Sequence, residues 1–401
     1  MRLIHTIITS LACICTLTSH TIAQTSPAWS LRDFYSQNQQ LDKEVETVFA
    51  NLSDWQRAGQ MIISVGGKSG YPKSKLDNLL AQNGLGGILL LSGEKNELTN
   101  LAKSFDQQSV RNGGLPLLFS ADAEPSLINR KISGLPSFPK TNTLTSATQS
   151  VKTAVAISNE LNKIGIQQNF APICDFSKNE DIIGNRSFGN NANSVAPLAV
   201  AFAHATQENN IIATAKHFPG HGNVKGDSHK KLVYIDGEMP ELPVFAYMIK
   251  EEVTSIMVGH IAVQNNPDFD TDGMPSSCSR LIVTDLLKQQ MQFKGLVVTD
   301  AMTMGALKQI PNAALKAVEA GIDMVLMPAS EAQLHQDILQ KMETNAAFKA
   351  QVYESVKKVI RMKICLGIVK PALYKKVDTE LKIVPIGKPT LPAPIKLAYS
   401  K

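Results

Sequence analysis

Short apolar segments recur along the chain and are separated by longer amphipathic segments. Each apolar segment is four to six residues long and rich in Ile, Leu or Val. This composition is typical of strands that are buried on both faces. The eight segments are Met61–Val65, Gly87–Leu91, Leu115–Ser120, Gln168–Ile173, Ile211–Ala215, Ser255–Gly259, Gly295–Thr299 and Met324–Met327.

In the segments between these predicted strands, the apolar residues have the spacing that is typical of helices. Thr148–Lys163 places its apolar residues along one helical side and is followed by Gly165, a helix stop, and Ser194–Gln207 repeats the pattern. Strands that alternate with helices in this way predict an α/β fold, a (β/α)8 TIM barrel. An open doubly wound sheet is the alternative, but it normally carries a glycine-rich phosphate turn after its first strand. Only Gly66-Gly67 stands at that point.

The start of the chain predicts a secretory signal peptide over residues 1–23. Met1-Arg2 is followed by an apolar stretch without Asp, Glu, Lys or Arg, which ends at the small residue Ala23. We therefore expect an exported, periplasmic protein. Thr, Ser and His interrupt the apolar run, so no transmembrane span is expected in the mature chain. Leu11-Ala12-Cys13 loosely resembles a lipoprotein box, which leaves a lipid anchor at Cys13 open.

The remaining chain divides into three parts by composition. Residues 24–45 are polar and predict a linker or a loosely held N-terminal arm. Residues 46–370 hold the strand–helix alternation and predict a single catalytic barrel domain. Pro occupies five of the positions in 371–401, which disfavours helices and predicts an extended C-terminal tail.

Charge and cysteine content exclude some classes of function. The net charge is +5, and Lys and Arg are scattered without a basic block, so no nucleic-acid partner is expected. Beyond the signal peptide, the cysteines are Cys174, Cys278 and Cys365, and three distant thiols do not form a disulfide framework. Composition therefore indicates an ordinary globular protein.

Titratable residues follow five of the eight predicted strands. In a barrel the carboxyl ends of the strands converge on one face, where the active sites of this fold lie. Asp is also a favoured helix N-cap, and that alternative stays open for Asp175. The residues at the strand ends are Asp122, Asp175, Lys216 with His217, His260 and Asp300.

The loop Lys216–Gly222 contains Pro and Gly, which predict a fixed, non-helical conformation. Its first two residues would present hydrogen-bond donors to hydroxyl groups or to a carbonyl. A zinc site is an alternative, with His217, His221, His229 and Asp227 as its possible ligands. However, Pro219-Gly220 lies between His217 and His221 and prevents these two residues from sharing one helical face. We predict no metal site.

A second polar loop contains Asp227-Ser228-His229 among lysines. If the loop bends, Asp227 can orient His229 and favour its protonated form, which would make His229 a general acid. A solvated surface pair is the alternative interpretation.

The motifs that follow the predicted strands, taken together and in order, resemble those of glycoside hydrolase family 3. The most similar branch is that of the single-domain β-N-acetylhexosaminidases. The resemblance covers about residues 50–365. Its motifs are Asn169-Phe170-Ala171-Pro172, Gly184-Asn185-Arg186-Ser187, Lys216–Gly222, Asp227-Ser228-His229 and Thr299-Asp300-Ala301-Met302.

The resemblance implies a retaining exo-β-N-acetylglucosaminidase that needs no cofactor. Asp300 would be the nucleophile and form a glycosyl-Asp intermediate, and His229, with Asp227 as its partner, would be the acid/base. The substrate would be terminal β-linked N-acetylglucosamine in peptidoglycan fragments or related oligosaccharides. The resemblance assigns substrate binding to Asp122, Arg130, Arg186, Lys216, His217 and His260.

One motif departs from the family pattern. The family usually has Asp-Gln-Glu-Gly-Gly followed by Arg, where this chain has Asp122-Ala123-Glu124-Pro125-Ser126 followed by Leu127. The family's second arginine is retained as Arg130. Pro and Ser in place of two glycines restrict the backbone, which puts the sugar preference in doubt. A family-3 β-glucosidase-like hydrolase of other sugars and an exported non-catalytic sugar-binding barrel are therefore the alternatives.

Overall fold

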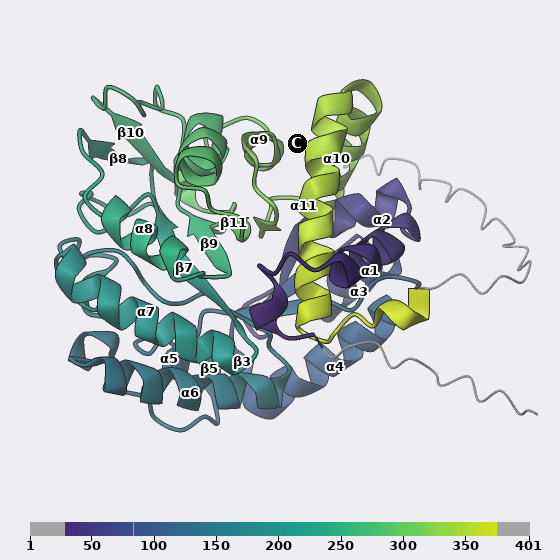
Figure 1. Ribbon diagram of the computed structural model, residues 1–401, viewed down its shortest axis with the longest axis horizontal. Helices are drawn as coiled ribbons and strands as arrows, with labels where there is room; N and C mark the ends of the chain where they lie inside the picture. The colour runs from purple at the N-terminus through teal and green to yellow at the C-terminus, as the bar shows by residue number, and fades with distance from the viewer. Residues whose placement is uncertain (1–28, 83, 375–401) are drawn as a thin grey trace, which may run out of the picture.

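The computed structural model describes residues 29–82 and 84–374 (Figure 1). The predicted signal peptide lies outside the described residues, as does the predicted tail from residue 375 onwards. Within the described part of the tail, Pro371–Tyr374 forms a short 3-10 turn.

Eight strands form one parallel sheet in which neighbouring strands follow the order of the chain. They are β1 (Ile62–Gly66), β2 (Gly87–Leu90), β4 (Leu118–Ala121), β6 (Gln168–Asn169), β7 (Ile212–Phe218), β9 (Ser255–Val258), β11 (Leu296–Thr299) and β12 (Val325–Leu326). β1 pairs with β12, and a parallel bridge between Val298 and Met324 joins β11 to the start of β12. The sheet thus closes into a barrel, which confirms the predicted (β/α)8 fold and excludes the open sheet.

Helices surround the barrel (Figure 1). They are α1 (Gln39–Ala50), α2 (Asp54–Gly59), α3 (Lys73–Ala81), α4 (Lys95–Arg111), α5 (Ile128–Lys131), α6 (Ala147–Ile164), α7 (Ala192–Glu208), α8 (Leu242–Lys250), the π-helix η5 (Leu281–Gln290), α9 (Ala313–Ala320), α10 (Glu331–Thr344) and α11 (Ala346–Cys365). The predicted helix over Thr148–Lys163 corresponds to α6. Its N-cap Ser146 accepts a hydrogen bond from the Gln149 N–H, and Gly165 ends it at a φ of 90°.

The segment predicted as a loose arm is instead part of the folded barrel domain. The Asn38 side chain caps α1 by accepting hydrogen bonds from two backbone N–H groups. Leu41 and Val45 are buried, and α1 packs against α11. The prediction was therefore wrong for the described residues 29–45. Helically spaced apolar residues, separated by Gln, Asp, Lys and Glu, provide the buried face of α1.

Two small parallel sheets lie outside the barrel sheet. β8 (Val233–Asp236) pairs with β10 (Ile261–Gln264), and β3 (Gly93–Glu94) pairs with β5 (Ile132–Ser133). The β8–β10 pairing connects the segment that follows the Asp227–His229 loop to the segment that follows β9. Across residues 29–82 and 84–374, no helix combines the length and apolar character needed to cross a membrane.

Candidate active site

The loops at the carboxyl ends of β4, β6, β7 and β11 bring charged side chains together. Lys216 lies in β7, and its Nζ is 3.0 Å from Asp122 Oδ1 and 2.6 Å from Glu124 Oε1. His217, the next residue, is 4.0 Å from Asp300 through its Nε2. Four of the residues expected from the sequence are therefore neighbours at one end of the barrel, as the convergence of strand ends requires.

Asp300 directly follows β11 and is held by backbone on both sides. Its N–H donates to the Val258 carbonyl at 3.0 Å, and its Oδ1 accepts from the Ala301 N–H at 2.7 Å. Its side chain is 17% exposed. Burial would raise the pKa of this carboxyl, but the nearby His217, His260, Ala301 N–H and Lys216 lower it to about 2. Asp300 is therefore an ionised carboxylate at neutral pH.

Asp175 organises the loop that leaves β7. Its carboxylate accepts the His217 N–H at 3.1 Å, approaches the His217 Nδ1 at 2.6 Å, and accepts the His221 N–H at 2.7 Å. The side chain is fully buried, and although burial would raise its pKa, the two histidines lower it. Asp175 is therefore not a helix cap, and it fixes the His217 ring with Nε2 on the side of Asp300.

Glu124 is a central member of the site that the sequence did not single out. Its carboxylate receives the Arg186 Nε at 2.8 Å and Nη2 at 2.7 Å, in addition to Lys216. Burial would raise the pKa of Glu124, but the charges of Arg186 and Lys216 hold it well below its usual range. Only its membership of the Asp122–Ser126 motif could have pointed to it, since a buried ion pair leaves no pattern in a sequence.

Arg186 and Lys216, which the family resemblance assigns to sugar binding, both bind Glu124. The Arg186 guanidinium also donates to the Ile182 carbonyl at 3.0 Å and is 15% exposed, and Lys216 is 2% exposed. Burial would lower the pKa of Lys216, but the carboxylates of Asp122 and Glu124 raise it. The side chain of Asp122 is 24% exposed, so it is the more accessible acceptor of the group.

Arg130 is separated from this cluster. Its side chain is exposed and makes no ion pair or hydrogen bond with residues 29–82 or 84–374. It lines a cavity of about 510 Å³ that Arg186 also lines. The departure from the family motif forms part of the same wall. Ser126 Oγ donates to the Asn185 carbonyl at 2.7 Å and accepts the Thr141 N–H at 2.9 Å.

His229 and Asp227 pair on the loop before β8. Asp227 Oδ1 is 2.9 Å from the His229 Nδ1 and accepts the His229 N–H at 2.9 Å. Burial would raise the pKa of Asp227, but these contacts and Lys230 lower it. The ionised Asp227 accepts from Nδ1, which leaves Nε2 as the ring nitrogen without a partner among the described residues. The His229 side chain is 61% exposed.

His260 lies behind Asp300 and does not line an open site. It is fully buried, with Nδ1 2.7 Å from Ser277 Oγ and Nε2 3.0 Å from the Ala301 carbonyl. Burial lowers its pKa, so the neutral ring is favoured. In this structure both ring nitrogens are engaged, one with Ser277 and one with the backbone next to Asp300, and contact of His260 with a sugar stays a prediction.

The histidines that could serve as zinc ligands are engaged in hydrogen bonds. His217 Nδ1 faces Asp175, and His221 Nε2 is 2.8 Å from Ser228 Oγ. In the part of the chain that the structure describes, no three His, Cys, Asp or Glu residues are grouped to hold a metal ion.

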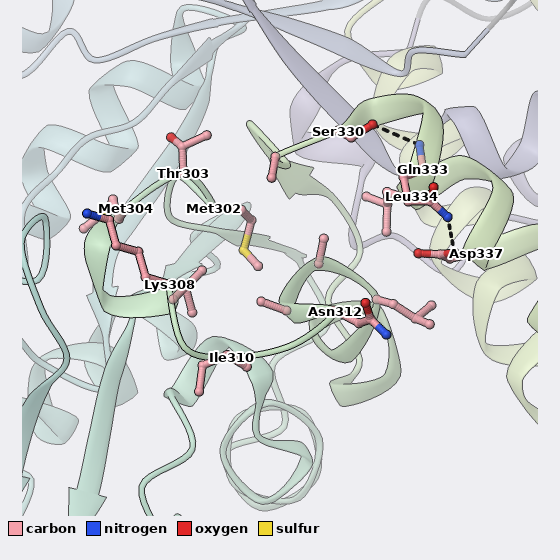
Figure 2. A pocket seen from close by; sticks show the side chains of 15 residues that line it. Met302, Thr303, Met304, Lys308, Ile310, Asn312, Ser330, Gln333, Leu334 and Asp337 are labelled. Atoms are coloured by element: carbon pink, nitrogen blue, oxygen red, sulfur yellow. Dashed lines mark hydrogen bonds between the residues drawn. The ribbon is translucent and has the colours of Figure 1, made fainter. Parts of the chain in front are cut away.

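A second cavity, of about 530 Å³, lies beside the loop that follows Asp300. Figure 2 shows Met302, Met304 and Ile310 on one side and Gln333 of α10 on the other. The Met302 N–H donates to the Leu326 carbonyl at 2.9 Å, so this wall begins at the ends of β11 and β12.

Comparisons with known proteins agree with this geometry. The chain is 30% identical over 329 residues to the "Beta-hexosaminidase A" of Pseudoalteromonas piscicida, an alignment that covers 72% of this chain and 55% of that protein. A family 3 β-N-acetylglucosaminidase structure from Paenibacillus sp. str. FPU-7 superposes with a TM-score of 0.73 at 26% identity, covering 79% of this chain and 63% of that one. The β-N-acetylhexosaminidase of Beutenbergia cavernae DSM 12333 superposes with a TM-score of 0.69 at 26% identity, covering 77% of this chain and 97% of that one.

The chain thus spans little more than half of the curated relative and nearly all of the Beutenbergia structure. Residues 55–362, most of the barrel, match the glycosyl hydrolase family 3 N-terminal domain. This protein therefore belongs to glycosyl hydrolase family 3.

Proposed function

We propose that this protein is a retaining exo-β-N-acetylglucosaminidase. The observation that carries the proposal is an ionised Asp300 at the end of β11, 4.0 Å from a histidine ring that a buried carboxylate orients. A nucleophilic carboxylate must be aimed and must stay ionised, and both conditions are met. The names of the relatives, β-hexosaminidases and β-N-acetylglucosaminidases, supply the sugar class.

Asp300 and His229 divide the chemistry of two steps. In the first, the Asp300 carboxylate attacks the anomeric carbon while His229 Nε2–H protonates the departing glycosidic oxygen, which leaves a glycosyl-Asp ester. In the second, neutral His229 takes a proton from water, the hydroxide oxygen bonds to the anomeric carbon, and the ester bond breaks. Asp227 holds the His229 ring through Nδ1 in both steps, which leaves Nε2 for the two proton transfers.

The acid/base is a histidine where many glycosidases use a second carboxylic acid. A second carboxylate close to Asp300 would raise the pKa of one of the two, because like charges disfavour ionisation of both. With His229 in that role, no second carboxylate raises the pKa of Asp300, and the free carboxylate stays ionised before the first step.

The charged cluster next to Asp300 would hold the sugar. Asp122 is the more accessible acceptor for a sugar hydroxyl, and the His217 Nε2 lies 4.0 Å from Asp300. Lys216 and Arg186 donate mainly to Glu124, so we assign them to holding the shape of this wall as much as to direct contact. Arg130 would contact parts of the substrate that enter its cavity.

The proposed substrates are peptidoglycan fragments or related oligosaccharides that end in β-linked N-acetylglucosamine. The signal-like residues 1–23 support this proposal, since an exported protein would meet the cell wall. We propose a periplasmic location on the same ground. If Cys13 is lipidated, the protein would instead be recovered with the membranes in a fractionation experiment.

Hydrolysis of 4-nitrophenyl N-acetyl-β-glucosaminide by the purified protein tests the proposal. Wild type should release nitrophenol, and the Asp300→Ala variant should be slower by about three orders of magnitude or more with an unchanged circular dichroism spectrum. Wild-type turnover by Asp300→Ala would refute the nucleophile assignment.

The same assay separates the alternatives. Faster hydrolysis of the nitrophenyl glucoside would show a β-glucosidase-like preference and direct attention to Pro125-Ser126, where the motif departs from the family. Binding of N-acetylglucosamine without turnover of either glycoside would indicate a non-catalytic sugar-binding barrel.

A further inference from the structure

The loop that carries His229 is attached to the loop that carries Asp300. Gly305 and Ala306, in the short 3-10 helix η6 (Gly305–Leu307), donate their backbone N–H groups to this loop. The Gly305 N–H reaches the His229 carbonyl at 2.9 Å, and the Ala306 N–H reaches the Ser228 carbonyl at 3.1 Å. Two successive carbonyls of the acid/base segment are thus bound by the chain a few residues beyond the nucleophile.

Only glycine fits at the point of closest approach. A Cβ added to Gly305 would lie 2.4 Å from the Lys230 carbonyl oxygen and 2.6 Å from the His229 carbonyl oxygen, far inside van der Waals contact. The φ of Gly305 is outside the left-handed region, so the requirement is for space and not for an unusual backbone conformation. Both opposing atoms are backbone, so they can move away only if the His229 loop moves.

The loop that carries His229 is also hydrogen-bonded to the loop that follows β7. Ser228 is 1% exposed, and its Oγ lies 2.8 Å from His221 Nε2. Asn179 Nδ2 donates to the Gly226 carbonyl at 3.2 Å and lies 3.3 Å from His221 Nδ1. His221 is itself anchored, since its N–H donates to Asp175.

We propose that Gly305 is a positioning residue for the acid/base, with the Ser228–His221 hydrogen bond as the second attachment of the same loop. The proposal rests on the proposed function, in which His229 moves the proton. His229 is 61% exposed, and apart from the contact of its Nδ1 with Asp227 its position depends on the backbone of this loop. Gly305 follows Asp300 by five residues, so the backbone of the His229 loop is hydrogen-bonded to the segment that begins at Asp300.

Hydrogen exchange tests the attachment without any use of activity. In wild type the amides of Gly305 and Ala306 should be protected, since both are donors to the His229 loop. In Gly305→Ala, peptides covering residues 225–232 and 301–308 should exchange faster, while peptides from the barrel strands stay unchanged. Unchanged exchange in both peptides would overturn the proposal, whatever the enzyme's substrate is.

Kinetics test the consequence for catalysis. Loss of the acid's position should slow the first step for substrates whose leaving group needs a proton, and should spare that step for activated aryl glycosides. We therefore compare kcat/KM, which reports the first step and not the base-assisted second step. For Gly305→Ala and for Ser228→Ala, we expect kcat/KM to fall about tenfold or more on an alkyl or disaccharide substrate, against little change on the 2,4-dinitrophenyl glycoside. In a His229→Ala background, Gly305→Ala should add no further loss.

Gly84→Ala is the matched control, because a Cβ there meets only the Leu79 carbonyl at an ordinary 3.5 Å. It should behave as wild type in both measurements. Equal losses on activated and unactivated substrates in Gly305→Ala and Ser228→Ala would show a purely structural role and refute positioning. A His229→Ala variant without leaving-group dependence would refute the acid/base assignment itself, which is a failure of the proposed function and not of the loop attachment seen by exchange.

Discussion

Replacing Glu241 with glutamine should remove a pH-dependent loss of stability from this protein. Glu241 is fully buried at the start of α8, beneath the loop that runs from Lys216 to Gly222. Its Oε1 accepts from Asn223 at 3.2 Å and from the Phe176 N–H at 3.5 Å, while its Oε2 has no hydrogen-bond partner among the described residues. Burial, and secondarily the charge of Asp175, raise its pKa from 4.5 to about 7.

The sign of the effect follows from which state binds more protons. Between pH 4.5 and 7 the unfolded chain has lost the Glu241 proton and the folded protein has kept it. Unfolding therefore becomes easier as the pH rises through this window, and the effect is complete above the folded pKa. At about 1.4 kcal/mol for each pKa unit, Glu241 costs the folded state about 3 kcal/mol at pH 8 and almost nothing at pH 4.

Glutamine has the same shape but no charge, so Glu241→Gln should be more stable than wild type by about 3 kcal/mol at pH 8 and roughly equal to it at pH 4. Urea unfolding of both proteins at several pH values measures this difference, and other titrating groups cancel in the comparison. A difference that does not change with pH would refute the assignment of a raised pKa to Glu241.

Three further predictions concern the charged cluster and metals. Glu124→Gln should lower the free energy of unfolding by about 3 kcal/mol or more, because the buried Arg186 loses its carboxylate partner and Lys216 keeps only Asp122; an unchanged urea midpoint would contradict this. Asp175→Asn should reduce kcat/KM by about two orders of magnitude while the fold is retained, since the His217 ring loses the acceptor that fixes its tautomer; wild-type kinetics would show that this orientation is not needed. Activity should survive prolonged dialysis against EDTA, and loss that added Zn²⁺ restores would revive the metal alternative.

The barrel could be predicted from the sequence because its strands are buried on both faces. Such strands must be continuously apolar, and eight of them are visible as short runs between helical patterns. The residues at the strand ends could be predicted for the same reason, since the fold fixes where they point. Asp300 and Lys216 are examples, each of which follows or ends an apolar run.

The pairing of buried charged side chains could not be predicted from the sequence. Glu124 and Asp175 are buried carboxylates whose partners come from strands far apart in the chain, and local patterns carry no information on such pairs. Helix α1 could not be recognised because polar residues separate its apolar positions. Its packing against α11 exists only in the folded protein.

The departure at Pro125-Ser126 shows how a motif can change while the local architecture is kept. The backbone freedom of two glycines is lost there, but Ser126 adds hydrogen bonds to Asn185 and Thr141, which tie the β4 loop to the loop that presents Arg186. The neighbouring Glu124 still binds Arg186 and Lys216 with distances below 3 Å. The substitution therefore alters the wall of the Arg130 cavity, while the surroundings of Asp300 are fixed by β7, β9 and β11. We accordingly expect this departure to affect which groups bind beyond the terminal sugar more strongly than it affects the catalytic step.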